Sequence, residues 1–374
     1  MSDAPEADRV DGAPHPRETA RLFGQNDAIA GFLEAFNAGR LHSGWLLTGP
    51  RGVGKATLAW QIATFLLATP AQEDAGLFGA PPPVTSLAIP PDHPDARLVQ
   101  SGAHPRLYVA RRQVNDKTGA LQSIINVDVI RGIKAFFHLS ATDGGRRVVI
   151  VDSADDLNPS AANALLKELE EPPANTTILL VAHQPSRLLP TIRSRCRVLR
   201  LAPLGAADLQ AALAQAGHTA TAPDALAALA DGSVGDALRL LNHDGLALYA
   251  ELVHLLDGIP QINRPAAIKL AESCAGRGSE ERFALLCDLI DRVMARLARA
   301  GLWGEPTVQG APGEARLLAR LAPHDLAART WADLHQRAGA RLRHGAAVNL
   351  DHAALILDIL FQIEQAALAA TTPA

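Results

Sequence analysis

The residue types and spacing most suggestive of a functional site are those of an anion-binding loop. They occur in the segment Gly49-Pro50-Arg51-Gly52-Val53-Gly54-Lys55. Glycines let a backbone turn sharply and approach an anion closely, and a lysine at the end of such a loop supplies a positive charge for phosphate groups. The apolar run 45–47 before it indicates a buried strand, and the apolar residues 58–67 after it indicate a helix. This order predicts a phosphate-binding loop, and a simple tight turn is the alternative.

The residues that would hold a metal ion beside this loop are incomplete. Ala56 stands where a Ser or Thr hydroxyl would hold Mg²⁺, and Thr57 is rotated about 100° further around the helix. Asp152 ends the β-branched run 147–151, where it would support a metal shell or, alternatively, cap a turn. Ser153 follows it, and a serine hydroxyl is a poor general base. We predict a degenerate nucleotide site made of Gly49, Gly52, Val53, Gly54, Lys55, Ala56, Thr57 and Asp152.

The composition is that of a globular protein without a disulfide or zinc framework. Of 374 residues, 48% are hydrophobic and 20% are charged, and the formal net charge of -4 provides no overall positive field for nucleic acid. Three cysteines, none in a Cys-x-x-Cys pair, argue against a sulfur-rich zinc site, so no metal is predicted. The N-terminus does not read as a signal peptide, and no stretch reaches the ~20 apolar residues of a membrane span. We expect a soluble cytoplasmic protein that does not contact a membrane.

Strands and helices alternate up to about residue 204, and only helices follow. Residues 1–18 lack periodicity and predict a flexible tail, and residues 19–204 predict an α/β domain whose parallel sheet is covered on both faces. A Pro- and Gly-rich insertion is expected at about 69–94. Short helices over 205–245 predict a small helical domain, and longer amphipathic helices over 246–374 predict an all-α domain.

Three motifs resemble those of clamp-loader subunits of the AAA+ class. Residues 163–173 (NALLKELEEPP) are similar to the signature helix of that family, Ser194-Arg195-Cys196 to its Ser-Arg-Cys motif, and Gly39-Arg40-Leu41-His42 to the segment before its phosphate loop. Together they span most of the α/β domain, and the whole chain resembles the delta-prime family of bacterial DNA polymerase III clamp loaders. The resemblance implies an α/β P-loop (AAA+, RecA-like) domain, a helical lid and an all-α collar that oligomerises.

The resemblance also implies a function that is carried out with partners. Motor subunits of the family bind ATP between neighbours, and Arg195 would be the arginine finger that reaches a neighbour's ATP. The chain departs from a motor at Ala56, at Ser153, at residues 181–184, which lack the Thr or Asn sensor, and at Gly235, where motors carry a lid arginine. We therefore expect a non-catalytic stator subunit. Its expected partners are motor (gamma/tau) and delta subunits in a pentameric ring, the sliding clamp, and primer-template DNA reached through the assembled complex.

Three alternatives stay open from the sequence. An active AAA+ ATPase motor subunit of a clamp loader would share the fold, and ATP hydrolysis by the isolated chain would identify it. A P-loop phosphotransferase would need the metal-binding hydroxyl and the substrate base that Ala56 and Ser153 do not supply. A stator that holds ATP or ADP without hydrolysis is compatible with Lys55 and the backbone cradle. The four-cysteine zinc module common in the delta-prime family has no counterpart after the phosphate loop, so zinc is not expected.

Overall fold

The computed structural model describes residues 6–69, 82–115, 117–139, 145–276, 278–348 and 350–371. The chain divides into two compact units, one comprising Met1–Gly217 with Gly232–Gly235 and the other His218–Asp231 with Asp236–Ala374. Much of the insertion expected at 69–94 lies outside the described residues, and residues 82–93 contain neither helix nor strand. The boundaries expected for a lid at 205–245 and a collar at 246–374 stay predictions.

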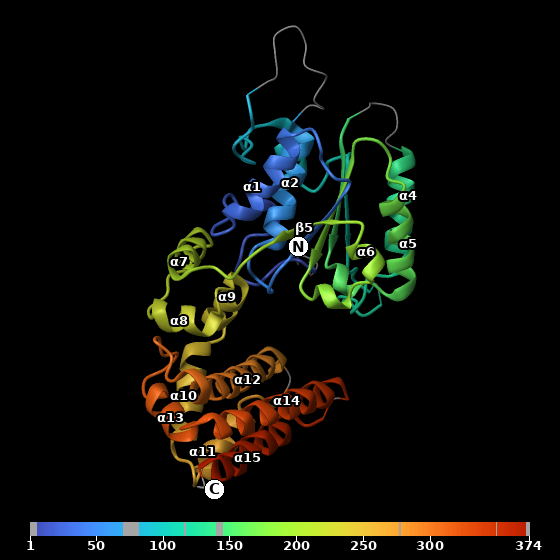
Figure 1. Ribbon diagram of the computed structural model, residues 1–374. Helices are drawn as coiled ribbons and strands as arrows, with labels where there is room; N and C mark the ends of the chain where they lie inside the picture. The colour runs from blue at the N-terminus through green and yellow to red at the C-terminus, as the bar shows by residue number, and fades with distance from the viewer. Residues whose placement is uncertain are drawn as a thin grey trace. The chain divides into compact units, whose positions relative to one another are not determined.

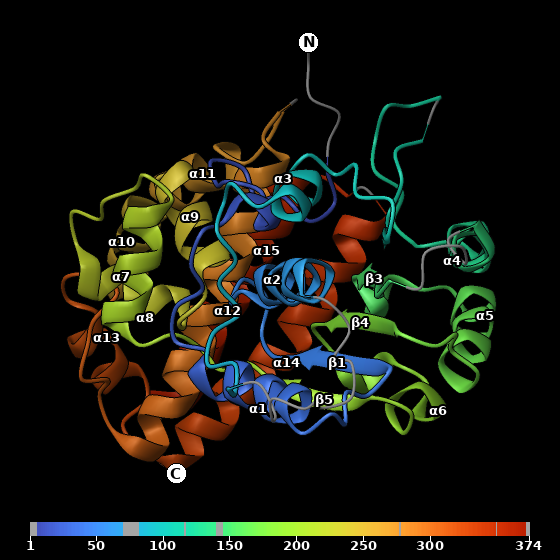
Figure 2. The same ribbon diagram turned by 90° about the horizontal axis from the view of Figure 1, so that it is seen from above.

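A five-stranded parallel sheet with the order β2-β3-β4-β1-β5 forms the centre of the first unit (Figures 1 and 2). Every residue of β1, β3 and β4 is buried, as the continuous apolar runs in the sequence predicted. The predicted α/β P-loop class is therefore confirmed. The strands are β1 (Gly44–Thr48), β2 (Leu107–Arg111), β3 (Arg147–Asp152), β4 (Thr176–Ala182) and β5 (Arg197–Arg200).

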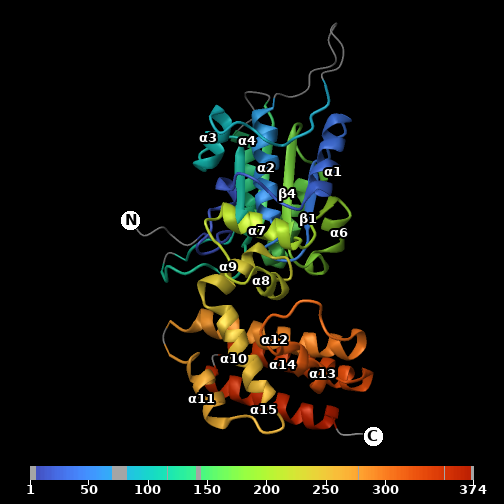
Figure 3. The same cartoon turned by 90° about the vertical axis from the view of Figure 1, so that its left-hand side faces the viewer.

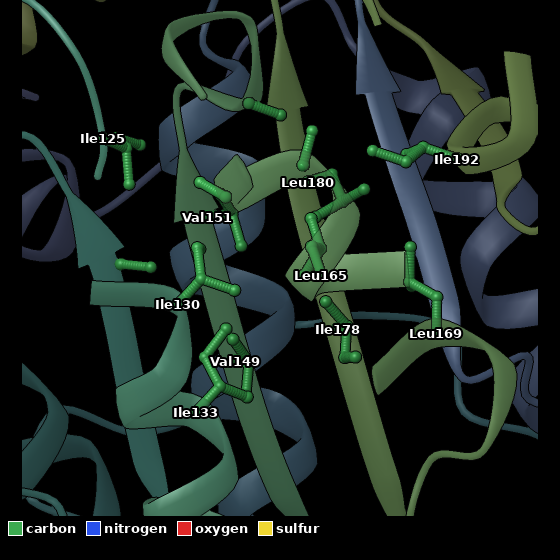
Figure 4. Packing of buried hydrophobic residues seen from close by; sticks show 14 of the residues in the cluster. Ile125, Ile130, Ile133, Val149, Val151, Leu165, Leu169, Ile178, Leu180 and Ile192 are labelled. Atoms are coloured by element: carbon green, nitrogen blue, oxygen red, sulfur yellow. The ribbon is translucent and has the colours of Figure 1, made fainter. Parts of the chain in front are cut away.

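Helices cover both faces of this sheet (Figure 1). One face carries α1 (Asn26–Asn37) and α2 (Lys55–Ala68), and α3 (Pro94–Gln100) packs against α2. The other face carries α4 (Val127–Leu139), α5 (Pro159–Glu170) and α6 (Pro190–Arg193), and α7 (Ala206–Gln215) follows β5 in the chain. Figure 4 shows Ile130 and Leu165 from α4 and α5 pointing at Val149 and Leu180 of the sheet. These buried side chains fix the positions of the strand ends that carry the candidate site.

Residues 6–18 pack within the first unit, whereas the sequence predicted a flexible tail over 1–18. His15 is fully buried, and its ring meets Trp60 of α2 edge-on with the ring centroids 5.7 Å apart. Asp8 lies 3.2 Å from the His15 ring and 2.6 Å from the guanidinium of Arg111, the last residue of β2. A polar segment can be buried when its charged groups find partners, and here the partners are distant in sequence.

The second unit is all helical. Tyr249 and Trp331 are among its largest fully buried side chains. The long helices α12 and α14 pack along each other, and α15 packs on α14 (Figure 3). Its helices are α8 (Pro223–Ala230), α9 (Val234–Asn242), of which Val234 and Gly235 belong to the first unit, α10 (Gly245–Asp257), α11 (Arg264–Glu272), α12 (Glu280–Trp303), α13 (Glu314–Leu321), α14 (Asp325–Ala347) and α15 (His352–Thr371).

Helix α15 corrects one expectation from the sequence. Among the described helices, residues 352–370 alone are long and apolar enough, by length and composition, to cross a membrane, whereas no such stretch was predicted from the sequence. Half of the apolar window is buried within the protein. Glu364, also buried in this helix, accepts hydrogen bonds from the Ile262 N–H at 2.8 Å and the Arg264 guanidinium at 2.6 Å. A carboxylate satisfied by protein groups fits a packed core helix.

Glu314 is the fully buried charge of the second unit. Its carboxylate accepts hydrogen bonds from the Tyr249 hydroxyl at 2.5 Å, from Arg296 Nε at 2.5 Å and from the Gly310 N–H at 2.5 Å. Burial, together with the charge of Glu314, raises the pKa of Tyr249, so the phenol keeps its proton and donates it. Each partner would lose a buried charge-assisted hydrogen bond if the carboxylate were removed.

We predict that Glu314→Ala lowers the free energy of unfolding by about 3–5 kcal/mol, because it leaves the Arg296 charge buried and unpaired. Glu281→Ala is the matched control, since the Glu281 side chain is 68% exposed and pairs with Arg239 across 3.7 Å. It should change the free energy of unfolding by less than about 1 kcal/mol. Urea unfolding followed by circular dichroism measures both, and equal shifts would contradict a structural role for Glu314.

Candidate functional site

The predicted phosphate loop joins the carboxyl end of β1 to the first turn of α2. Gly52 has φ 72°, and a Cβ atom at this position would lie 2.2 Å from Ser233 Oγ, so only glycine fits. The backbone turns here with further positive φ angles and then enters the helix, as the spacing predicted. The remaining residues of the predicted loop and first turn lie together at this edge of the sheet: Gly49, Val53, Gly54, Lys55, Ala56 and Thr57.

The amine of Lys55 is bound to the loop itself. Lys55 Nζ donates hydrogen bonds to the carbonyl oxygen of Gly49 at 2.7 Å and to that of Pro50, and the residue is only 3% exposed. Burial lowers the pKa of Lys55 to about 8, against the raising effect of the Asp152 and Asp155 charges. The positive charge predicted for phosphate binding is thus directed at backbone oxygens of the same loop.

Asp152 lies at the carboxyl end of β3, in register with Arg111 of β2. Burial raises the pKa of Asp152 to about 7, and the nearby charge of Asp8 adds to this effect, whereas Lys55 and Arg111 oppose it. Arg111 forms its ion pairs with the N-terminal segment, with Asp8 at 2.6 Å and with Glu6 at 2.9 Å. The N-terminal segment therefore brings its own carboxylates to the edge where Asp152 was predicted to support a metal shell.

Asp155 organises the ends of β3 and β4. Its Oδ2 atom accepts a hydrogen bond from Ser153 Oγ at 3.2 Å, and also from the backbone N–H groups of His183 and Gln184. Burial lowers the pKa of His183 to about 4, and the Lys55 charge acts in the same direction. A neutral imidazole therefore lies near Lys55, in the segment where the sequence showed no Thr or Asn sensor. Neither Asp155 nor His183 has a role that the sequence predicted.

Gly235, where motor subunits would carry a lid arginine, lies directly on the phosphate loop. The N–H groups of Val234 and Gly235 donate to the carbonyl oxygen of Gly52 at 2.9 and 3.3 Å. A Cβ atom at Gly235 would lie 3.1 Å from Gly52 Cα, so a larger residue requires the two backbones to separate. Residues 232–235 therefore hold the loop through main-chain contacts.

Gln25 also holds the loop, a role that was not predicted from the sequence. The buried side-chain amide donates to the carbonyl oxygens of Val53 at 3.2 Å and Ala202 at 2.8 Å, and it accepts from the Ala202 N–H at 3.1 Å. It thereby links the phosphate loop to the chain that leaves β5. The only signal in the sequence was a side-chain amide directly before the helix that starts at Asn26.

Arg195 lies at the opposite end of the sheet from this loop. It precedes β5, and its backbone oxygen would be 3.1 Å from a Cβ atom at Gly44, the first residue of β1. Four residue steps along β1, about 13 Å, separate Gly44 from Thr48 at the loop. The guanidinium pairs with Glu170 at 2.7 Å, and the Arg195 side chain is 37% exposed. The structure therefore brings the predicted nucleotide residues together but places Arg195 apart from them.

Cys196, the neighbour of Arg195, is poorly suited to act as a nucleophile. Burial raises the pKa of its thiol to about 12, so the thiolate is scarce at neutral pH. Its Sγ atom would lie 3.2 Å from a Cβ atom at Gly44, which indicates close packing at the start of the sheet. The cysteine of this motif therefore fills space beside an accessible arginine.

The residues at the loop fit a phosphate group but not a catalytic metal. The glycine backbone and the start of α2 can surround an anion, as in other phosphate loops. Position 56 offers no oxygen ligand, and Ser153 donates to Asp155 instead of acting as a base. Throughout the part of the chain that the structure describes, no group of three or more His, Cys, Asp or Glu side chains could hold a metal ion.

Comparison with known proteins identifies similar sequences. Residues 24–205 match the family described as DNA polymerase III, delta subunit. DNA polymerase III subunit delta' of Pseudomonas aeruginosa is 38% identical over 235 residues, which span 61% of this chain and 64% of that protein. The Escherichia coli subunit of the same name is 30% identical over 334 residues, 88% of this chain and 91% of that protein. A crystal structure of a DNA polymerase III gamma subunit-related protein from Thermotoga maritima has 17% identity and a TM-score of 0.40, covering 90% of this chain and 99% of that one.

We predict that Asp152→Asn becomes more stable relative to the parent protein as the pH rises from 4 to 8. The pKa of Asp152 in the folded protein, about 7, lies above its ordinary value of 3.8. Its stabilising contribution is therefore complete below pH 4 and is lost as the pH rises through 7. About three pKa units correspond to a change of up to about 4 kcal/mol.

The measurement is urea unfolding of both proteins across this pH range. The control is Asp128→Asn, because the Asp128 side chain is 78% exposed and should show no comparable trend. A stability difference between Asp152→Asn and the parent that stays constant with pH would show that Asp152 ionises normally.

Proposed function

This chain belongs to the delta-prime family of DNA polymerase III subunits, and from that premise we propose that it is the non-catalytic stator subunit of a replicative clamp loader. In this proposal it supports the loading of a sliding clamp onto primed DNA. It acts in the cytoplasm, in a pentameric ring with motor (gamma/tau) and delta subunits, and meets primer-template DNA through the assembled complex.

The observation that carries the proposal is the separation of Arg195 from the phosphate loop of its own chain. The two lie at opposite ends of β1, so Arg195 is not placed to serve the loop that contains Lys55. Its side chain is partly exposed, and the Glu170 that pairs with it is 47% exposed. Such an exposed pair is worth little energy and can be exchanged for another anion. We propose that this anion is the γ-phosphate of ATP bound to a neighbouring motor subunit.

The second part of the proposal is that the loop of this chain does not hydrolyse ATP. Lys55 is bound to Gly49 and Pro50, and Ala56 offers no metal ligand. The carboxylate of Asp152 is largely desolvated and close to the charge of Asp8. The backbone cradle still permits static retention of ATP or ADP, since main-chain N–H groups require none of the missing side chains.

We predict that Arg195→Ala, assembled with motor and delta subunits, lowers DNA-dependent ATP hydrolysis and clamp loading. An arginine finger accelerates phosphoryl transfer by about 10³ or more, so the one ATP site that Arg195 serves should become nearly silent. Arg195→Lys should recover little of the lost ATP hydrolysis and clamp loading, because lysine lacks the planar fork of the guanidinium. The thermal midpoint of the isolated chain should hardly change, because the pair with Glu170 is exposed.

Arg193→Ala is the matched control, since Arg193 is an exposed arginine of the same turn. It should leave hydrolysis and loading at the parent level. Parental rates in Arg195→Ala would contradict the arginine-finger role. Equal losses of activity in both variants would show that the loss comes from the change in surface charge.

We predict that the isolated chain shows no steady ATP turnover with Mg²⁺ and that Lys55→Ala leaves clamp loading by the complex unchanged. Calorimetric titration with ATP or ADP then reports whether the loop retains nucleotide. Sustained hydrolysis by the purified chain, abolished in Lys55→Ala, would instead identify an active motor subunit.

A further inference from the structure

A groove runs between the edge of the sheet and α1. It has a volume of about 280 Å³ and is lined by Asp27, Ala28 and Gly31 of α1 and by Arg197–Arg200 of β5. Strand β5 is the outermost strand beside β1, and α1 lies next to it (Figure 2). The groove is distinct from the phosphate loop and does not include Arg195.

The outer backbone of β5 is in position to accept another strand. The N–H of Leu201 donates to the Thr48 carbonyl at 2.8 Å, so the backbone groups of residues 199 and 201 point toward β1. Because successive residues of a strand alternate, the N–H and C=O groups of Val198 and Arg200 point away from β1. An edge of this kind offers hydrogen-bond donors and acceptors to an extended peptide.

The exposed side chains of β5 would best match a peptide in which acidic residues stand on either side of an apolar residue. Val198 is 44% exposed although it is a β-branched apolar residue. Arg197 and Arg200 are exposed on either side of it, and in the described part of the chain neither forms an ion pair with a carboxylate. The Arg197 guanidinium lies 5.3 Å from the ring centroid of Trp45, which fixes it at the groove. A second copy of β5 would place arginine against arginine, so self-pairing is disfavoured.

Gly31 keeps the groove open without being required by the fold. A Cβ atom at this position would meet only Leu199 Cδ2, at 3.8 Å, which is an ordinary contact. Glycine inside a helix is less stable than alanine because it loses more backbone freedom on folding. The packing of α1 on β5 therefore tolerates a side chain here, and its absence leaves room beside the edge strand.

We propose that this groove binds an extended acidic peptide segment of a partner protein, which adds to β5 as a sixth strand. Backbone hydrogen bonds form to Val198 and Arg200. Acidic side chains of the peptide pair with Arg197 and Arg200, and an apolar side chain covers Val198. Nucleic acid fits less well, because its phosphates would neither pair with the edge backbone nor cover Val198.

The test is fluorescence anisotropy with the full chain and labelled peptides of about six residues, the usual length of a strand. The peptides carry the order acidic, apolar, polar, acidic, or its reverse, and matched peptides carry lysine in place of the acids. We expect saturable binding of the acidic peptides only. Arg200→Glu should weaken it by about tenfold or more and shift the preference toward the lysine peptides.

Two further variants separate the backbone and groove contributions. Val198→Pro removes an outward N–H while leaving the ladder to β1 intact, and Val198→Thr keeps that donor. Gly31→Leu fills the groove, and Ala30→Leu adds the same side chain to an exposed position of α1 outside the groove. Val198→Pro and Gly31→Leu should each lower affinity by about tenfold, whereas the two controls should bind within a few-fold of the parent. Thermal melts confirm that each variant is folded.

Equal binding of acidic and lysine peptides, or parental affinity in both Arg200→Glu and Gly31→Leu, would overturn the proposal. Labelled single-stranded DNA is the competing probe. If it displaces the acidic peptide and Val198→Pro leaves the binding of both unchanged, the edge is a general polyanion surface and not a strand acceptor.

Discussion

The structure of the first unit depends on the position of β1 between β4 and β5. All five residues of β1 are buried, and its ladders with both neighbours are parallel. Parallel pairing places equivalent ends of the three strands at the same edge of the sheet. The carboxyl ends of β1 and β4 therefore carry the phosphate loop and the contacts of Asp155, whereas Arg195 lies just before the start of β5, at the opposite end. The length of β1 therefore separates the phosphate loop at its carboxyl end from Arg195 near its amino end.

Intramolecular contacts stabilise the carboxyl edge. A buried charge is costly unless it is paired, and Lys55 and Asp8 both have protein partners here. Lys55 binds carbonyl oxygens of its loop, and Asp8 binds Arg111 and His15. Burial by itself would raise the pKa of Asp8. Its partners His15 and Arg111 favour the charged form instead, so the pKa of Asp8 is lowered to about 2. Charged side chains at the carboxyl ends of these strands are therefore stabilised by contacts within the protein.

Much of the fold followed from local patterns, because apolar runs and periodicity report burial directly. The run Arg147–Asp152 was predicted as a strand and is β3, and the helix expected after Gly54 is α2. The contacts of Gln25 were not predictable, because it bonds to Ala202 across 177 positions of the chain. The packing of residues 6–18 was missed for the same reason, since Asp8 meets Arg111 across 103 positions. A polar segment carries no local sign of a partner that far away.

The residue types alone set the chemistry that is available at each position. Ala56 has no hydroxyl and Ser153 has no carboxylate in any fold, and the glycines of the loop permit turns that other residues resist. Which of these groups meet follows from the folded chain. Strand register separated Arg195 from Lys55, and burial joined the N-terminal segment to β2 and left the edge of β5 exposed. The physical reason is that side-chain type is a local property, whereas register and burial arise from contacts between residues far apart in the chain.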